Sequence, residues 1–250
     1  MPRERQNPPG RVTLPAFWGM IALRKDVSKM TKRIPLKDRP LPDYTRGEEW
    51  MNTLTHACGV GLGIIALVLC LVRAKTPAET LGALVFGITM IGLYAVSSIY
   101  HGMPPGMGKK VMQVIDHCAI YFLISGTYTP ILLSAFLPVY PKIAWGLLAL
   151  QWGLCITATV LTAIDLRRYR VFSMICYIGM GWSIIAFLGK CVEVMTVSGF
   201  ALLLAGGIVY TVGAVLYGLG GKRRWLHSIF HVFVVAGSLL QFLSVLLYAM

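Results

Sequence analysis

Long apolar runs constrain the fold of this chain more than any other feature of its sequence. Seven runs lie at about 53–73, 80–101, 111–137, 142–164, 171–189, 194–219 and 225–249. About 20 apolar residues in a helix cross the roughly 30 Å hydrocarbon core of a bilayer, whereas barrel strands would appear as short alternating segments. Charged residues make up 13% of the chain, against about 25% in soluble domains. The sequence therefore predicts an all-α, multi-pass protein of the cytoplasmic (inner) membrane with seven transmembrane helices.

The distribution of basic residues predicts the orientation of these helices. Of the 23 Lys and Arg residues, 19 lie in the N-terminal tail and in the second, fourth and sixth connections, and four lie in the other three connections. Because basic residues stay on the cytoplasmic side, we expect a cytoplasmic N-terminus and an outside C-terminus. The net charge of +13 then reflects membrane topology, and nucleic-acid binding is not expected.

The sequence divides into a tail, residues 1–50, and a membrane domain, residues 51–250. The tail holds 11 of the basic residues and one ten-residue apolar stretch, 14–23, which is too short to span a bilayer and precedes no small-residue cleavage site. We expect this tail to be cytoplasmic, and either disordered or resting on anionic lipid. The six cysteines are scattered without a C-x-x-C pair, so they predict neither a disulfide framework nor a thiolate metal site.

Glycine and proline positions predict where helices pack closely or bend. Gly59, Gly61 and Gly63 in the first run are expected to permit close helix contact and not to form a phosphate loop. The third run is long and contains Gly126 and Pro130, so we expect a kinked or tilted helix there.

Histidines gather at one predicted depth of the membrane. His101 ends the second run, and His227 and His231 begin the seventh, so all three fall near the cytoplasmic face. The i, i+4 spacing sets the last two about 6 Å apart along one helix face. Asp116 enters the same layer about one and a half turns into the third helix. Structural zinc binding contributes about 10–16 kcal/mol in peptides, which would offset such polar intrusions, so the layer predicts a metal site.

Other polar residues surround this predicted layer. Ser97 lies one turn from His101 on the same face. Three residues of the first helix share a face at the cytoplasmic entrance, where they are expected to hydrogen-bond to the ligands or bind a lipid head group: Glu49, Asn52 and His56. His117 points roughly 100° away from Asp116 and is a weaker ligand candidate. Each motif alone is common in packing helices, and their coincidence at one depth favours a metal.

Together these residues resemble the hemolysin III family, within the progestin and adipoQ receptor superfamily, which is related to alkaline ceramidases. The matching motifs, which extend over about residues 45–250, are Glu49-x-x-Asn52-x-x-x-His56, Ser97-x-x-x-His101, Asp116, Gly126-Thr127-Tyr128-Thr129-Pro130 and His227-x-x-x-His231. The resemblance implies a seven-helix bundle with a cytoplasmic amino end and a zinc ion bound by His101, His227 and His231. It further implies that Asp116 lies near a water on the metal. Ala119 stands where the eukaryotic receptors tend to have Gly, which puts receptor-specific ligand chemistry in doubt.

Our leading hypothesis is a zinc site that hydrolyses, or senses, a membrane lipid, in keeping with the lipid homeostasis role linked to bacterial members. Three histidines leave a fourth zinc position open, and zinc lowers the pKa of bound water toward about 7. Asp116 would orient that water or take its proton, and Ser97 would support Asp116 or an oxyanion. The alternatives are a non-enzymatic, receptor-like protein with structural zinc, and the cytolysis that the family name implies. Haem binding is disfavoured because the histidines lie on one side. No protein partner can be named.

Overall fold

The computed structural model describes residues 34–219 and 223–250, and the regular elements among them are all helical, as expected. The α-helices are α2 (Arg46–Arg73), α3 (Pro77–Gly102), α4 (Met107–Pro130), α5 (Pro141–Ile164), α6 (Arg170–Trp182), α7 (Leu188–Leu219) and α8 (Leu226–Ser244). Short 3-10 or π segments are η1 (Leu36–Asp38), η2 (Ile131–Phe136), η3 (Ser183–Phe187) and η5 (Val245–Ala249). The predictions for the apolar stretch 14–23 and for most of the basic tail fall outside the described residues.

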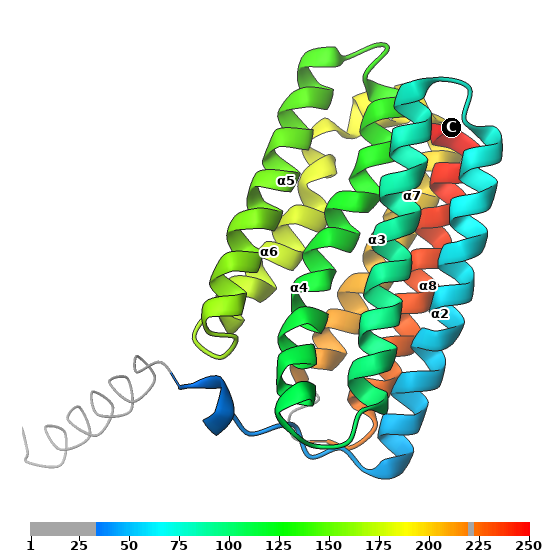
Figure 1. Cartoon of the computed structure of the whole chain (residues 1–250). Helices are drawn as coiled ribbons and strands as arrows, with labels where there is room; N and C mark the ends of the chain where they lie inside the picture. The colour runs from blue at the N-terminus through cyan, green and yellow to red at the C-terminus, as the bar shows by residue number, and fades with distance from the viewer. Residues whose placement is uncertain (1–33, 220–222) are drawn as a thin grey trace, which may run out of the picture. The chain divides into compact units, whose positions relative to one another are not determined.

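Residues 36–250 form one compact unit, a bundle of helices that run roughly side by side (Figure 1). Helix α2 packs against α3, α3 against α4 and α4 against α5. At the other end of the sequence α7 packs against α8, and α8 returns to contact α2. The first and last helices of the bundle are therefore neighbours, which brings residues far apart in the sequence to one place.

Among the described residues, six helical segments are long and apolar enough to cross a membrane. One of them, Arg170–Gly218, has 49 residues and would be about 74 Å long as a continuous helix, more than twice the thickness of the hydrocarbon core. Within it, η3 separates α6 from α7, and α7 is itself interrupted at Thr196, where φ is 64° and ψ is 168°. The interruption lies just inside the start of the run expected at 194–219.

Helix α2 begins at Arg46, several residues before the first apolar run. A capping box explains this early start: the Thr45 hydroxyl accepts the Glu48 N–H at 3.3 Å, and the Glu48 carboxylate accepts the Thr45 N–H at 2.8 Å. Hydropathy misses this polar first turn. Because the turn is helical, Glu49 and Asn52 become part of the bundle.

Two of the three glycines that were expected to permit close helix contact do so. A Cβ added at Gly59 would lie 2.5 Å from the Tyr94 ring, and one at Gly63 would lie 3.1 Å from the backbone nitrogen of Ile91. Gly61 has nothing within 4 Å, so the expectation of a close contact there is wrong. Gly59 and Gly63 both face α3, whereas Gly61 lies on another side of α2.

The third apolar run is distorted at Pro130, within the run where a kinked or tilted helix was expected. Regular α-helical hydrogen bonding ends at Pro130, and the π-helical segment η2 follows it directly. Proline has no N–H to donate and its ring crowds the preceding turn. On the same helix, Gly126 lies against Thr89 so closely that an added Cβ would be 2.0 Å from the hydroxyl oxygen.

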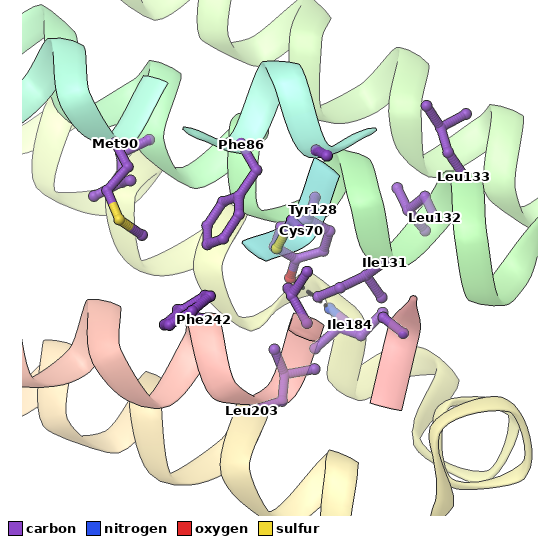
Figure 2. Packing of buried hydrophobic residues seen from close by; sticks show 14 of the residues in the cluster. Cys70, Phe86, Met90, Tyr128, Ile131, Leu132, Leu133, Ile184, Leu203 and Phe242 are labelled. Atoms are coloured by element: carbon purple, nitrogen blue, oxygen red, sulfur yellow. Dashed lines mark hydrogen bonds between the residues drawn. The ribbon is translucent and has the colours of Figure 1, made fainter. Parts of the chain in front are cut away.

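The apolar core fills the bundle at the end remote from the histidines. Phe86, Met90, Tyr128, Ile131 and Phe242 are buried there and come from α3, α4, η2 and α8 (Figure 2). Phe86 lies near the start of α3, whereas His101 lies at its end. The end that carries the polar residues is thus held by polar contacts more than by packing of large apolar side chains.

Candidate metal centre

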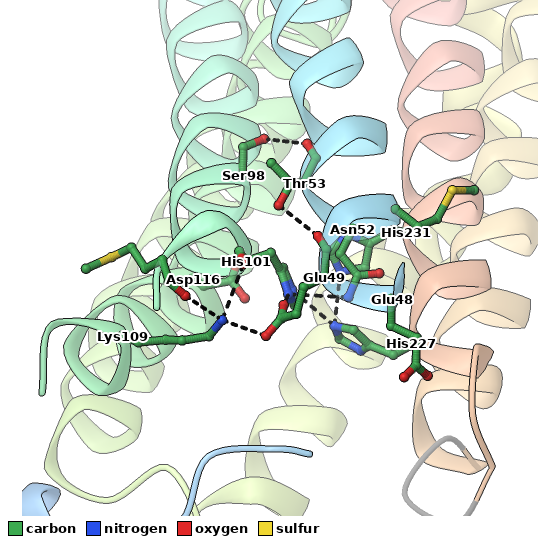
Figure 3. Close-up of polar contacts among 12 residues, drawn as sticks. Glu48, Glu49, Asn52, Thr53, Ser98, His101, Lys109, Asp116, His227 and His231 are labelled. Atoms are coloured by element: carbon green, nitrogen blue, oxygen red, sulfur yellow. Dashed lines mark hydrogen bonds and ion pairs between the residues drawn. The ribbon is translucent and has the colours of Figure 1, made fainter. Parts of the chain in front are cut away.

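Three histidines from two helices converge at one end of the bundle. His101 lies at the end of α3, and His227 and His231 lie in the first two turns of α8 (Figure 3). The Nε2 atom of His227 is 3.3 Å from Nε2 of His101 and 3.0 Å from Nε2 of His231. One ligating atom from each ring lies within 4.8 Å of the others. The three side chains could therefore hold a metal ion.

Glu49 on α2 orients the first of these imidazoles. Its Oε2 atom lies 2.6 Å from Nδ1 of His101, and Nε2 of the same ring faces the other two histidines. The other carboxylate oxygen accepts from the Lys109 ammonium at 2.5 Å, and Lys109 also donates to the carbonyl oxygen of Met103 at 2.9 Å. The Asn52 amide lies 3.3 Å from the same Nδ1. Such a carboxylate–histidine pair fixes the ring and raises its basicity as a ligand.

A second carboxylate, Glu48, ties the start of α8 to the start of α2. Its Oε1 atom accepts the backbone N–H of Trp225 at 2.6 Å, and Oε2 lies 3.6 Å from the Arg224 guanidinium. Trp225 has φ 67°, in the left-handed region, which costs a bulky residue roughly 1–2 kcal/mol. Glu48 is buried, and its hydrogen bond holds this strained residue two positions before His227.

Aromatic rings cover two of the three histidines. The Tyr44 ring stacks on His227 with centroids 4.9 Å apart and an interplanar angle of 18°. On the other side, His56 stacks on His231 at 3.8 Å and 22° and meets Tyr94 edge-on. Burial raises the pKa of the Tyr44 phenol above its usual value, so the hydroxyl stays protonated at neutral pH. These contacts restrict the imidazole orientations.

The group borders a cavity of about 790 Å³ that runs into the bundle. His227, His231, Ser97 and Asp116 all line it, and Asp116 retains 15% side-chain exposure and interacts with the Ser97 hydroxyl. Many of the other lining residues are apolar and include Leu123, Ile131, Ile184, Phe200 and Leu203, with Gln241 among the polar ones. The volume falls within the about 300–1,000 Å³ typical of ligand pockets. The arrangement offers a ligating group, a carboxylate and an apolar chamber in one space.

His117 stands apart from the three convergent histidines. Its Nδ1 is 2.8 Å from the Gln113 carbonyl oxygen and its Nε2 is 3.1 Å from the Tyr217 hydroxyl. Both ring nitrogens are therefore engaged elsewhere, as its direction relative to Asp116 suggested.

Sequence reasoning had missed three residues of this centre. Lys109 had been counted as a loop cation that reports topology, yet it is only 4% exposed. Glu48 and Tyr44 lie just before the first apolar run, where hydropathy gives no signal. The Thr-x-x-Glu capping pattern at Thr45 could have extended the helix and drawn attention to Glu48.

Comparisons with known proteins match most of the chain. A sequence profile described as "Haemolysin-III related" matches residues 44–242. Hemolysin-3 of Bacillus cereus is 39% identical over 206 residues, covering 81% of this chain and 92% of that protein. Hemolysin-3 homolog of Bacillus subtilis (strain 168) is 35% identical over 208 residues, covering 82% and 96%. The human Monocyte to macrophage differentiation factor is 24% identical over 224 residues, covering 86% and 90%.

Proposed function

Because the chain belongs to the haemolysin-III-related family and is a multi-pass protein of the cytoplasmic membrane, we propose that it binds zinc through His101, His227 and His231 and hydrolyses an amide or ester bond of a membrane lipid. Its role would be in membrane lipid homeostasis. The observation that carries the proposal is the convergence of three imidazole nitrogens at the edge of a largely apolar cavity, whose wall includes His227, His231 and Asp116.

The proposal includes seven membrane spans, with the N-terminus in the cytoplasm and the C-terminus outside. Division of the 49-residue segment at Thr196 gives stretches of about 39 and 33 Å, each close to the hydrocarbon thickness. Seven spans place the three histidines at the side where the basic residues are concentrated. A relative from Arabidopsis thaliana, 26% identical over 151 residues, is named Heptahelical transmembrane protein 5.

The spacing of the imidazole nitrogens supports zinc as the metal. Nitrogen ligands lie about 2.0–2.1 Å from zinc, and tetrahedral geometry then separates two of them by about 3.3–3.4 Å. The distances from His227 to His101 and to His231 are 3.3 and 3.0 Å. Imidazole ligands without thiolates suit zinc, as they also suit copper, iron and nickel.

The chemistry of the site follows from the residues around the metal position. Zinc, when bound, supplies a Lewis acid and lowers the pKa of water. Asp116 takes the proton of the attacking water as its oxygen adds to the carbonyl carbon, while Ser97 supports that carboxylate. The carbon–oxygen or carbon–nitrogen bond then breaks, and Asp116 returns the proton to the leaving alcohol or amine. The products are a carboxylic acid and that alcohol or amine.

A second candidate function is a receptor-like protein in which zinc is structural. The ligands come from α3 and α8, and Glu49, which supports one of them, comes from α2. A metal at this position would tie three helices together at the end of the bundle where the apolar core is absent. The bundle would then respond to lipid or to a partner without turnover.

Metal content tests the shared premise of both functions. Elemental analysis of the purified protein should find about one zinc per chain, and His101→Ala, His227→Ala and His231→Ala should each lose it. His117→Ala is the matched control and should keep the metal, because its ring is engaged outside the group. Equal zinc contents in all four variants would contradict the assignment.

Turnover separates the two functions. Metal-replete protein should hydrolyse ceramides, lysolipids or acyl amides above the rate of His101→Ala. Asp116→Asn should keep zinc and thermal stability but lose this hydrolysis. No hydrolysis above the control, or full activity in Asp116→Asn, would refute the enzyme and leave structural zinc.

A further inference from the structure

We infer that the ligand of the cavity is an amphiphile with a phosphate head group, an anionic lysophospholipid or phospholipid of the inner leaflet, and that arginines at the cavity mouth recognise the phosphate. The inference rests on the proposed function only for the chemistry of the bond that is cut. The head-group recognition stands on charges and contacts at the mouth, none of which belongs to the metal group.

All five basic residues that line the cavity are arginines: Arg39, Arg167, Arg170, Arg223 and Arg224. Three carboxylates line it too, on Asp43, Glu48 and Asp116, so five guanidinium groups against three carboxylates leave an excess of two positive charges. The lysines in the first turn of α4, Lys109 and Lys110, do not line the cavity. Arginine presents a planar fork that binds phosphate oxygens in pairs, which lysine cannot do. Membrane topology alone would require only positive charge.

The arginines on one side of the mouth are held in place. The Asp165 carboxylate accepts the backbone N–H groups of Arg167 and Arg168 at 3.1 and 3.2 Å, which fixes the turn between α5 and α6. Arg39 is buried and donates to the carbonyl oxygen of Ile164, at the end of α5, at 3.0 Å. A fixed turn that directs Arg167 to the cavity and Arg168 away from it provides a defined anion position.

The cavity also places its groups in a chemical order. Arg224 lies just before α8, His227 and His231 lie in its first two turns, and Val234 and Gln241 line the cavity farther along the helix. The ten residues from His231 to Gln241 span about 15 Å. Across the cavity, Arg170 is close enough to Tyr217 to interact electrostatically, and the Tyr217 ring lies 5.7 Å from that of His227.

This order matches one class of lipid. The cations would bind a phosphate. The metal ligands and the carboxylate would act on an acyl ester, and the apolar chamber would hold a hydrocarbon tail. In such a substrate the ester carbonyl would lie in the layer of Asp116 while the tail contacts Ile184 and Leu203, which border the core in Figure 2. A neutral lipid amide would offer no anion to Arg167 and Arg170.

Binding of non-hydrolysable ether lipids tests the inference without requiring turnover. Purified, metal-replete protein in neutral detergent is titrated with 1-O-hexadecyl-glycerophosphate and with 1-O-hexadecyl-glycerol, which has the same tail but no phosphate. The anionic lipid should bind at least tenfold more tightly. Inorganic phosphate should compete only weakly, because the tail contributes most of the binding. Equal affinities, or phosphate binding as tightly as the anionic lipid, would overturn the inference.

Neighbouring arginines provide the matched variants. Arg167→Ala and Arg170→Ala should each weaken binding of the anionic lipid about tenfold and leave binding of the phosphate-free glycerol lipid unchanged. Arg168→Ala removes an equal charge outside the cavity and should change neither. Arg170→Lys keeps the fold and the charge but loses the fork, and should weaken anionic binding severalfold. Equal losses in Arg167→Ala and Arg168→Ala would show a general surface-charge effect and refute the inference. Head-group selectivity without hydrolysis would refute only the enzyme, and hydrolysis without selectivity only this inference.

Discussion

Replacement of Glu49 by Gln gives the sharpest test of how the histidine group is held. The carboxylate accepts from His101 at 2.6 Å and from Lys109 at 2.5 Å. Glutamine has nearly the same shape, but its single carbonyl oxygen can accept from only one of these partners, and it carries no charge. Loss of the outer partner of a metal ligand costs about 10–100-fold in metal affinity, or about 1.4–2.7 kcal/mol. We therefore expect Glu49→Gln to bind zinc at least tenfold more weakly.

The same change affects stability through Lys109. Breaking a buried ion pair typically costs about 3–5 kcal/mol because it leaves an uncompensated charge. Here we expect the lower end, about 3 kcal/mol, because Glu49 is 21% exposed and Lys109 keeps the carbonyl oxygen of Met103 as an acceptor at 2.9 Å. The double variant Glu49→Gln/Lys109→Met removes both charges. It should regain stability while zinc affinity stays low.

Two measurements on detergent-purified protein separate these effects: zinc affinity by competition with a chelator, and thermal unfolding with and without that chelator. Glu193→Gln is a suitable control, because Glu193 accepts from Tyr140 away from the histidines. Zinc affinity within twofold of the original protein in Glu49→Gln would refute the support of His101 by Glu49. Zinc affinity that returns in the double variant would show that the loss came from the stranded charge on Lys109.

Two further predictions address packing and topology. Gly126→Ala should destabilise the protein by about 1–3 kcal/mol, because its Cβ would lie 2.0 Å from the Thr89 hydroxyl. Gly92→Ala, with nothing within 4 Å, should be neutral or slightly stabilising. Equal thermal midpoints for the two variants would contradict the close approach. Alkaline phosphatase fused after Met250 should be active, because that end is expected outside, and the same enzyme inserted at Gly106 should be inactive; activity at both positions would exclude the proposed orientation.

Hydropathy was sufficient to locate the helices because burial in lipid demands long apolar runs and leaves few alternatives. Hydropathy missed helical turns that are made of polar residues. The start of α2 depends on the capping box of Thr45 and Glu48, which apolar runs do not reveal. It also could not give the backbone of Trp225, whose positive φ is held by a contact 177 residues away in sequence.

The convergence of the histidines was predictable for a different reason. Alternating spans place the end of one helix beside the start of another, so His101 and His227 fall at one depth by counting alone. Which carboxylate would reach His101 was not predictable, because Glu49, Asn52 and His56 share a face and only the α2–α3 packing selects among them. Asp116 was expected in the same layer, and it lines the cavity beside Ser97 rather than joining the histidine group.

The separation of the ligands along the chain has a consequence for biogenesis. His101 and His227 are 126 residues apart, and α8 leaves the ribosome after the helix that carries His101. An insertion intermediate that lacks α8 presents a single oriented imidazole with its carboxylate, which cannot chelate an ion. Zinc binding would therefore indicate completed insertion, and a nascent chain stalled before Trp225 should not bind zinc.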